Sequence, residues 1–178
     1  MEKRKIRIII GILCMVICTG GLMWRIIYIN QRFPEETIIE TKYGEFAVLQ
    51  QGVELKVLGQ EWIPFQEEEK QNGVDGYNYI VTVQLKNAGE EAVEADLTLL
   101  YIGLEGYANG IEMEKYLEQN REVGTLHPTL EKGETLEVKL VYNLLESQWK
   151  KKDWKHVTEK SYYLQKMCYP YIYRWNCS

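Results

Sequence analysis

Hydrophobic residues follow two different patterns along this chain. No charged residue occurs from residue 8 to residue 24, whereas hydrophobic and polar residues alternate from about residue 53 onward. An uninterrupted apolar run of this kind is typical of a membrane-spanning helix, and alternation with a period of two is typical of half-buried strands. We therefore predict one apolar helix followed by a body made of strands.

The alternation occurs in four separate segments. Its apolar positions are Val53, Leu55 and Val57; Tyr79, Val81, Val83 and Leu85; Val93, Ala95, Leu97, Leu99 and Tyr101; and Leu136, Val138, Leu140 and Tyr142. Turn-forming residues separate these segments, and at Gly89 we expect a positive φ. Residues 111–120 favour a helix, and residues 161–175 form a last extended stretch in which Pro170 favours a sheet edge or a bulge. The pattern predicts an antiparallel β-sandwich.

The N-terminal apolar segment is long enough to cross a membrane. Its seventeen uncharged residues rise roughly 26 Å as a helix, and the residues up to Ile29 complete the thickness of a bilayer core. Basic residues precede it at positions 3, 4, 5 and 7, so the N-terminus is expected in the cytoplasm. We predict a cytoplasmic tail (1–7), a transmembrane helix (8–29), a stalk (30–44) and an extracellular sandwich (45–178).

Two other fates of this segment were weighed. A cleaved signal peptide needs small residues of the A-x-A kind, and Thr19-Gly20-Gly21 is a poor substitute. A lipoprotein needs a small residue before its modified cysteine, but Leu13 precedes Cys14 and Ile17 precedes Cys18. We favour the uncleaved anchor at the cell membrane, with the cleaved signal peptide as the alternative.

Charge is unevenly distributed along the chain. Residues 1–32 carry six bases and one acid, whereas residues 33–178 carry fifteen bases and twenty-five acids. This acidic balance argues against a nucleic-acid partner.

One basic segment stands out within the acidic part. The candidate surface contact comprises Trp149, Lys150, Lys151, Lys152, Trp154 and Lys155. Lysines and tryptophans of this kind suit an anionic membrane or wall polymer. The alternative, which we favour, is that both tryptophans close one end of the sandwich while the lysines stay in water.

Residues suited to catalysis or metal binding are few. His127 and His156 lack the spacing of a zinc site, and no phosphate loop, nucleophile elbow or Cys-His signature occurs. Glu67–Glu69 offers ligands for calcium, but consecutive side chains diverge, so a solvated loop is favoured. Cys168 and Cys177 lie about 30 Å apart in one extended stretch and are expected as free thiols. We predict no cofactor, no metal and no enzymatic activity.

A combination of strand and turn motifs resembles a known group of proteins. It comprises Y-x-x-V-x-V-x-L-x-N-x-G ending at Asn87 and Gly89, then L-x-x-G-E-T from Leu130 to Thr135, LVY from Leu140 to Tyr142, and Tyr169-Pro170. These motifs resemble the uncharacterised immunoglobulin-like ectodomains of membrane-anchored proteins in Gram-positive bacteria. The resemblance covers about residues 45 to 175 and implies a fold and a location, not an activity.

These observations lead to two hypotheses on function. The first is a non-enzymatic binding or accessory module of unknown ligand that meets a protein partner at the outer face of the membrane. The alternative is a structural component of the cell envelope, whose basic C-terminal region contacts anionic wall polymer or lipid.

Overall fold

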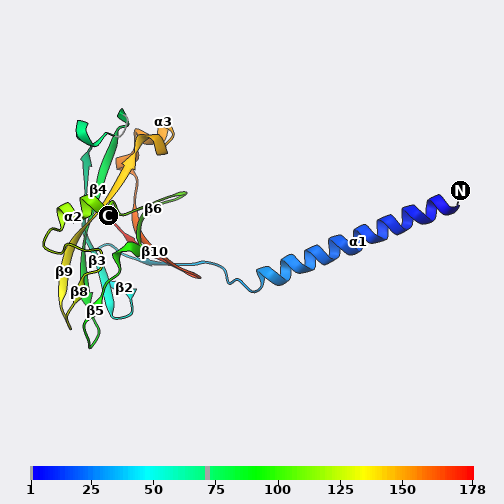
Figure 1. Ribbon diagram of the computed structural model, residues 1–178, viewed down its shortest axis with the longest axis horizontal. Coiled ribbons are helices and arrows are strands. Elements are labelled where there is room, and N and C mark those ends of the chain that lie inside the picture. The colour runs from blue at the N-terminus through cyan, green and yellow to red at the C-terminus, as the bar shows by residue number, and fades with distance from the viewer. Residues whose placement is uncertain (1, 71–72) are drawn as a thin grey trace. The chain divides into compact units, whose positions relative to one another are not determined.

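The computed structural model describes residues 2–70 and 73–178 and divides into two compact units, Met1–Thr37 and Ile38–Ser178. The first unit consists mainly of helix α1, Glu2–Asn30 (Figure 1). Its part Gly11–Asn30 has a mean hydropathy of 1.9 and is long and apolar enough to cross a membrane, a property that an anchor and a signal sequence share. Residues 2–7 of the predicted tail form the start of α1, and Met1 lies outside the described residues.

The second unit is made mostly of strands, and seven of its strand pairs are antiparallel. A five-stranded sheet has the order β1 (Thr37–Thr41), β11 (Tyr171–Asn176), β10 (Tyr163–Cys168), β6 (Leu100–Leu104), β7 (Tyr107–Gly110). A four-stranded sheet has the order β2 (Ala47–Gln50), β3 (Val53–Pro64), β4 (Gly76–Asn87), β9 (Thr135–Leu145). β5 (Val93–Glu94) pairs with β8 (Thr129–Leu130).

Short helices connect these strands. They are α2 (Met113–Gln119), α3 (Lys151–Trp154) and the 3-10 helices η1 (Glu67–Glu69), η3 (Leu97–Leu99), η4 (Glu146–Gln148) and η5 (Val157–Glu159). Within this unit α3 lies at one end, and β2, β5 and β8 lie toward the other end (Figure 1).

The core lies between the two large sheets. Nearly all of the predicted inward residues of β3, β4 and β9 are buried: Val53, Leu55, Val57, Tyr79, Val81, Val83, Leu85, Val138, Leu140 and Tyr142. Leu136 of β9 is partly buried and packs against them. Ile102, Leu164 and Trp175 of the five-stranded sheet belong to the same buried cluster. Burying a large apolar side chain stabilises a fold by about 1.5–3 kcal/mol, so this shared layer is the main source of stability. The predicted β-sandwich is confirmed.

Helix α2 covers part of the outer face of the four-stranded sheet, which confirms the helix predicted over residues 111–120. Ile80 and Val141 point away from the sandwich core and are nevertheless only 4% and 1% exposed. The Asn120 side chain donates to the Lys139 carbonyl oxygen (2.9 Å) and accepts from the Lys139 N–H (2.9 Å). Asn120 therefore satisfies backbone groups of β9 that a neighbouring strand would otherwise pair.

The segment predicted as one strand from Val93 to Tyr101 is broken, which corrects the prediction. Asp96 accepts hydrogen bonds from the Thr98 N–H (3.0 Å) and hydroxyl (2.5 Å), and the chain turns through η3. The turn reverses the alternation, so Tyr101 is 39% exposed while Leu100 and Ile102 are buried. β5 and β6 consequently belong to different sheets.

The C-terminal stretch is a hairpin rather than one extended strand. β10 and β11 pair antiparallel, and Tyr169 and Pro170 connect them through a cis peptide bond. Cys168 is exposed beside this connection, and Cys177 is buried where its N–H donates to Tyr162. The two thiols therefore lie at opposite ends of the hairpin, about 20 Å apart, which is beyond disulfide reach.

Two further predictions need correction. Residues 37–41 of the predicted stalk form β1, at the edge of the five-stranded sheet. Gly89 is not among the glycines with positive φ. Its N–H donates to the Asn87 side chain (2.8 Å), and an added Cβ would lie 3.2 Å from the same oxygen. Close approach to Asn87, rather than a left-handed backbone, therefore favours glycine there.

Candidate functional site

The predicted basic segment separates into two sets of side chains. The Trp149 ring packs on Tyr107 with ring centroids 4.7 Å apart, and the Trp154 ring lies 5.4 Å from that of Tyr77. Both tryptophans are half-buried and pack against the core cluster. Their rings therefore close one end of the sandwich and are not presented together to solvent.

The lysines of the same segment point into water. Lys150, Lys151, Lys152 and Lys155 are exposed, on and beside α3. Within residues 2–70 and 73–178, none of these lysines is found in an ion pair with a carboxylate. The segment therefore presents four exposed lysines beside a single acid, Asp153, on a body whose balance is acidic.

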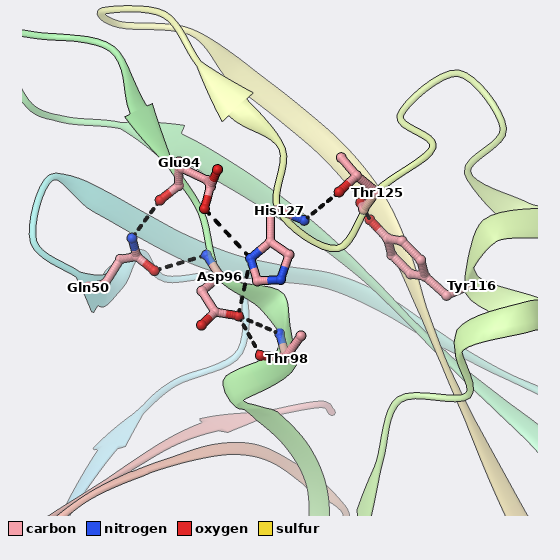
Figure 2. A network of polar contacts seen from close by, with 7 residues as sticks. All are labelled: Gln50, Glu94, Asp96, Thr98, Tyr116, Thr125 and His127. Carbon is pink, nitrogen blue, oxygen red and sulfur yellow. Dashed lines mark hydrogen bonds and ion pairs between the residues drawn. The ribbon is translucent and has the colours of Figure 1, made fainter.

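A network of polar contacts joins three segments near β5 and β8 (Figure 2). Gln50 donates to the Glu94 carbonyl oxygen (2.7 Å) and accepts from the Asp96 N–H (3.0 Å). The His127 N–H donates to the Thr125 hydroxyl oxygen (3.0 Å). The bonds of Gln50 connect the segment that leads from β5 to η3 with the end of β2, and the bond of His127 stabilises the loop before β8.

His127 is the residue of this network whose side chain is most suited to acid–base chemistry. Its Nδ1 lies 3.8 Å from a Glu94 oxygen and 3.6 Å from an Asp96 oxygen. The sequence did not indicate this cluster, because it depends on the register of β5 and β8, which brings position 96 opposite position 127. Asp96 already accepts two hydrogen bonds from Thr98. The arrangement therefore stabilises the turn after β5 and its contact with the loop before β8.

The three consecutive glutamates diverge, as the sequence predicts. Glu69 accepts from the Gln66 N–H (2.6 Å), from Asn78 (3.0 Å) and from Lys115. Glu67 instead pairs with Lys70 (2.6 Å). Glu69 therefore ties η1 to β4 and α2. In the part of the chain that the structure describes, no group of three or more His, Cys, Asp or Glu side chains is placed to hold a metal ion.

Hydroxyl and thiol groups gather in the core close to Cys177. Burial raises the pKa of Cys177 to about 11, and burial is also the main cause that raises the pKa of Tyr162, Tyr79 and Tyr142. Tyr79 donates to Gln60. A buried thiol with a raised pKa is a poor nucleophile, so Cys177 acts as a core residue.

The connection of the C-terminal hairpin carries exposed apolar side chains. We define the hairpin tip as Met167, Tyr169 and Tyr171, all of which are exposed. Cys168 is exposed between them. The register pairs Met167 with Ile172 on the outer face of the sheet and Tyr171 with Cys168 on the opposite face, so the hairpin tip exposes apolar groups on both faces. Exposed apolar groups of this kind are typical of contact surfaces.

Comparison with solved structures supports the fold. An uncharacterised β-sandwich protein from Clostridium difficile is 14% identical, with a TM-score of 0.50, over 82% of this chain and 97% of the other. A candidate lipoprotein from Bacillus subtilis is 11% identical, with a TM-score of 0.42, over 70% of this chain and 35% of the other. The likeness to the Clostridium difficile protein supports the fold alone, and the immunoglobulin-like topology stays a prediction.

Comparison with protein families gives a more specific result. No curated protein matches the chain significantly. The family model described as a domain of unknown function, DUF5028, matches residues 55–171, which include β4, β6, β9 and β10. The chain belongs to the DUF5028 family.

Proposed function

We propose that this chain is a non-enzymatic binding module anchored in the cell membrane of a Gram-positive bacterium. In this proposal α1 crosses the membrane once, the N-terminus is cytoplasmic, and an immunoglobulin-like sandwich meets a protein partner outside. The mean hydropathy of 1.9 over Gly11–Asn30 and the basic residues before it support the topology.

The observation that carries the binding role is the hairpin tip. Tyrosine and methionine are enriched in protein interfaces, and a hairpin end that exposes such side chains on both faces is suited to a groove on a partner. The proposal assigns the chain no enzymatic activity, and it treats Glu69 and Asp96, which accept hydrogen bonds within the fold, as structural residues.

Topology is tested with protease and intact protoplasts. We expect residues beyond about position 40 to be digested while the N-terminus remains protected. Secretion of a soluble protein that begins near Gly21 would instead establish the cleaved signal peptide.

Binding is tested with the full chain in membranes, used as bait on the envelope fraction of its own cell. We expect one protein to be recovered by the unchanged chain and lost with a Met167→Ser/Tyr171→Ser double variant. The matched control replaces Lys150, Lys151, Lys152 and Lys155 by Gln and should retain the partner. Equal recovery by the tip variant would contradict the role of the hairpin tip.

The alternative, a structural component that contacts anionic polymer or lipid, is favoured by the exposed lysines around α3. Four lysines near an anionic surface contribute about 1 kcal/mol each, and this attraction weakens as salt is added. Retention on wall polymer that falls with salt, and that only the lysine variant loses, would favour this alternative.

A further inference from the structure

The outer face of the five-stranded sheet has a hollow of about 310 Å³ beside the β6–β7 turn. The strand register explains its shape, because Gly103 of β6 lies between Ala108 of β7 and Tyr163 of β10. The side chains of Tyr163 and Gln165 lie over Gly103, where an added Cβ would be within 3.0 Å of both, and the larger Met167 and Ile172 line the hollow further along.

Arg174 is the charged residue of this hollow. Its guanidinium carbon lies 4.2 Å from the centre of the Tyr163 ring, and its Nε is buried with no hydrogen-bond partner among the described residues. No ion pair is found for Arg174 in the same part of the chain, and no acidic residue lines the hollow. An unpaired, partly buried arginine is unusual in a body with ten more acids than bases after residue 32.

The hollow around Arg174 has polar side chains next to the guanidinium group and apolar side chains along its wall. Gln165 is opposite Arg174 in the register and is only 4% exposed, although it lies on the outer face. Tyr163 adds a phenol, whereas Met167, Ile172 and Leu104 add apolar wall. A planar guanidinium forms two parallel bonds with a carboxylate, and a carboxamide beside it supplies a further donor.

We propose that this hollow binds a carboxylate of a protein partner, from an acidic or C-terminal residue with an apolar side chain next to it. The proposal rests on the binding role proposed above and names the chemistry that the partner presents. A single unpaired cation matches a single negative charge, which favours a carboxylate over a more highly charged phosphate. The apolar wall beside Arg174 matches the neighbouring side chain.

The aromatic rings favour a peptide over a sugar. A sugar ring stacks on an uncovered aromatic face, but Arg174 covers the Tyr163 ring, and Trp149 packs on the Tyr107 ring. The Tyr163 ring edge also lies over Gly103, where an added Cβ would be 2.7 Å away. Both rings that line the hollow are therefore already in use.

The first experiment measures binding of small probes to the full chain in detergent micelles, with the methionine methyl groups isotope-labelled. N-acetyl-L-leucine carries a carboxylate and an apolar side chain, and N-acetyl-L-leucinamide is its neutral match. We expect the acid to shift the Met167 methyl resonance in the millimolar range and the amide to bind at least about tenfold more weakly. Met113, which is exposed on α2, should not shift.

Variants distinguish the site from general attraction to positive charge. Arg174→Gln should abolish the Met167 shift, and Arg174→Lys, which keeps the charge but loses the planar fork, should weaken binding about tenfold. Arg121→Gln removes the same charge from an exposed loop and should change nothing. Gly103→Ala leaves the charge unchanged but brings a Cβ within 2.7 Å of the Tyr163 ring and 2.9 Å of the Gln165 carboxamide. It should displace both groups and weaken binding while the arginine remains.

Several results would overturn the proposal. They are equal binding of acid and amide, an unchanged shift in Arg174→Gln, preference for glucuronate, which would indicate a glycan, or preference for inorganic phosphate. None of them depends on membrane topology. The protoplast experiment can therefore fail while this site stands, and the reverse also holds.

Discussion

The outer faces of the two large sheets differ in how far their apolar side chains are buried. On the four-stranded sheet, Ile80 and Val141 are buried beneath α2 and its flanking segments, although both point away from the sandwich core. On the five-stranded sheet, Tyr101 and Met167 are exposed, and the hollow around Arg174 is open. A hollow of about 430 Å³ also lies beside Ile80 and Val141, but the apolar side chains themselves are buried there, whereas those of the five-stranded sheet are exposed. This difference favours the five-stranded sheet for the proposed binding.

The sheet edges show the same division. Backbone groups of β9 at the edge of the four-stranded sheet bond with Asn120 (2.9 Å) and with the Glu112 N–H (2.8 Å). β1 at the edge of the five-stranded sheet consists mostly of exposed residues. Both differences favour the five-stranded sheet for the proposed contact surface.

Thiol labelling gives the largest expected contrast between open and covered positions. At pH 8 a charged maleimide should modify Cys168 at least about 100-fold faster than Cys177, because the pKa of Cys177 is raised from 9.0 to about 11 and its side chain is 1% exposed. Peptide mapping of the full chain would separate the two from Cys14 and Cys18. Similar rates would mean that Cys177 is not in the core, and a Cys168–Cys177 disulfide would contradict the hairpin.

Stability measurements test the two outer faces directly. Ile80→Ala should lower the free energy of unfolding by about 2–4 kcal/mol, because it leaves a cavity beneath α2. Met167→Ala, on the open face, should change it by no more than about 0.5 kcal/mol. Denaturant midpoints of the two variants supply the measurement. A small effect at Ile80 would show that α2 does not cover the sheet tightly.

The inner face of the four-stranded sheet provides a smaller contrast within one strand. Val83→Ala removes fully buried methyl groups and should cost about 1–3 kcal/mol, whereas Gln84→Ala on the outer face should stay within about 0.5 kcal/mol. The same midpoints decide this case. Equal and small effects would contradict the register of β4, since a slip by one residue exchanges the two faces.

The sequence predicts the inward face of β3, β4 and β9 correctly because each is a long strand with one face on the core. It misses the break after Ala95, where one Asp96 side chain caps a turn that reverses the alternation. It also misses β1, because most of its residues are exposed and therefore give no apolar alternation. The alternation of hydrophobic and polar residues reports burial, so it cannot predict turns that depend on one local hydrogen bond or strands whose residues are mostly exposed.

The candidate sites are harder to predict than the strands. Trp149 and Lys150 are neighbours in the sequence and suggest one surface, yet the rings pack inward while the lysines point outward. The hollow around Arg174 combines residues of β6, β7, β10 and β11. These residues meet only because of the strand order, and the sequence alone predicted one C-terminal strand where the fold has a hairpin.

Two glycines give the smallest expected contrast and separate backbone conformation from contact. Gly133 has a φ of 73° with no atom near an added Cβ, whereas Gly89 lies outside the left-handed region and approaches Asn87. Gly133→Ala should therefore cost about 1–2 kcal/mol through its conformation alone. Gly89→Ala should cost less than about 1 kcal/mol, because the Asn87 side chain must shift by only a few tenths of an ångström. Denaturant midpoints again measure both variants.

A larger cost at Gly89 would mean that the Asn87 side chain cannot move. Its bonds to the carbonyl oxygens of Glu91 (2.8 Å) and Leu130 (2.9 Å) would then hold it rigidly in place. An Asn87→Ala/Gly89→Ala double variant would then show strong coupling between the two positions, whereas independent effects would exclude that explanation.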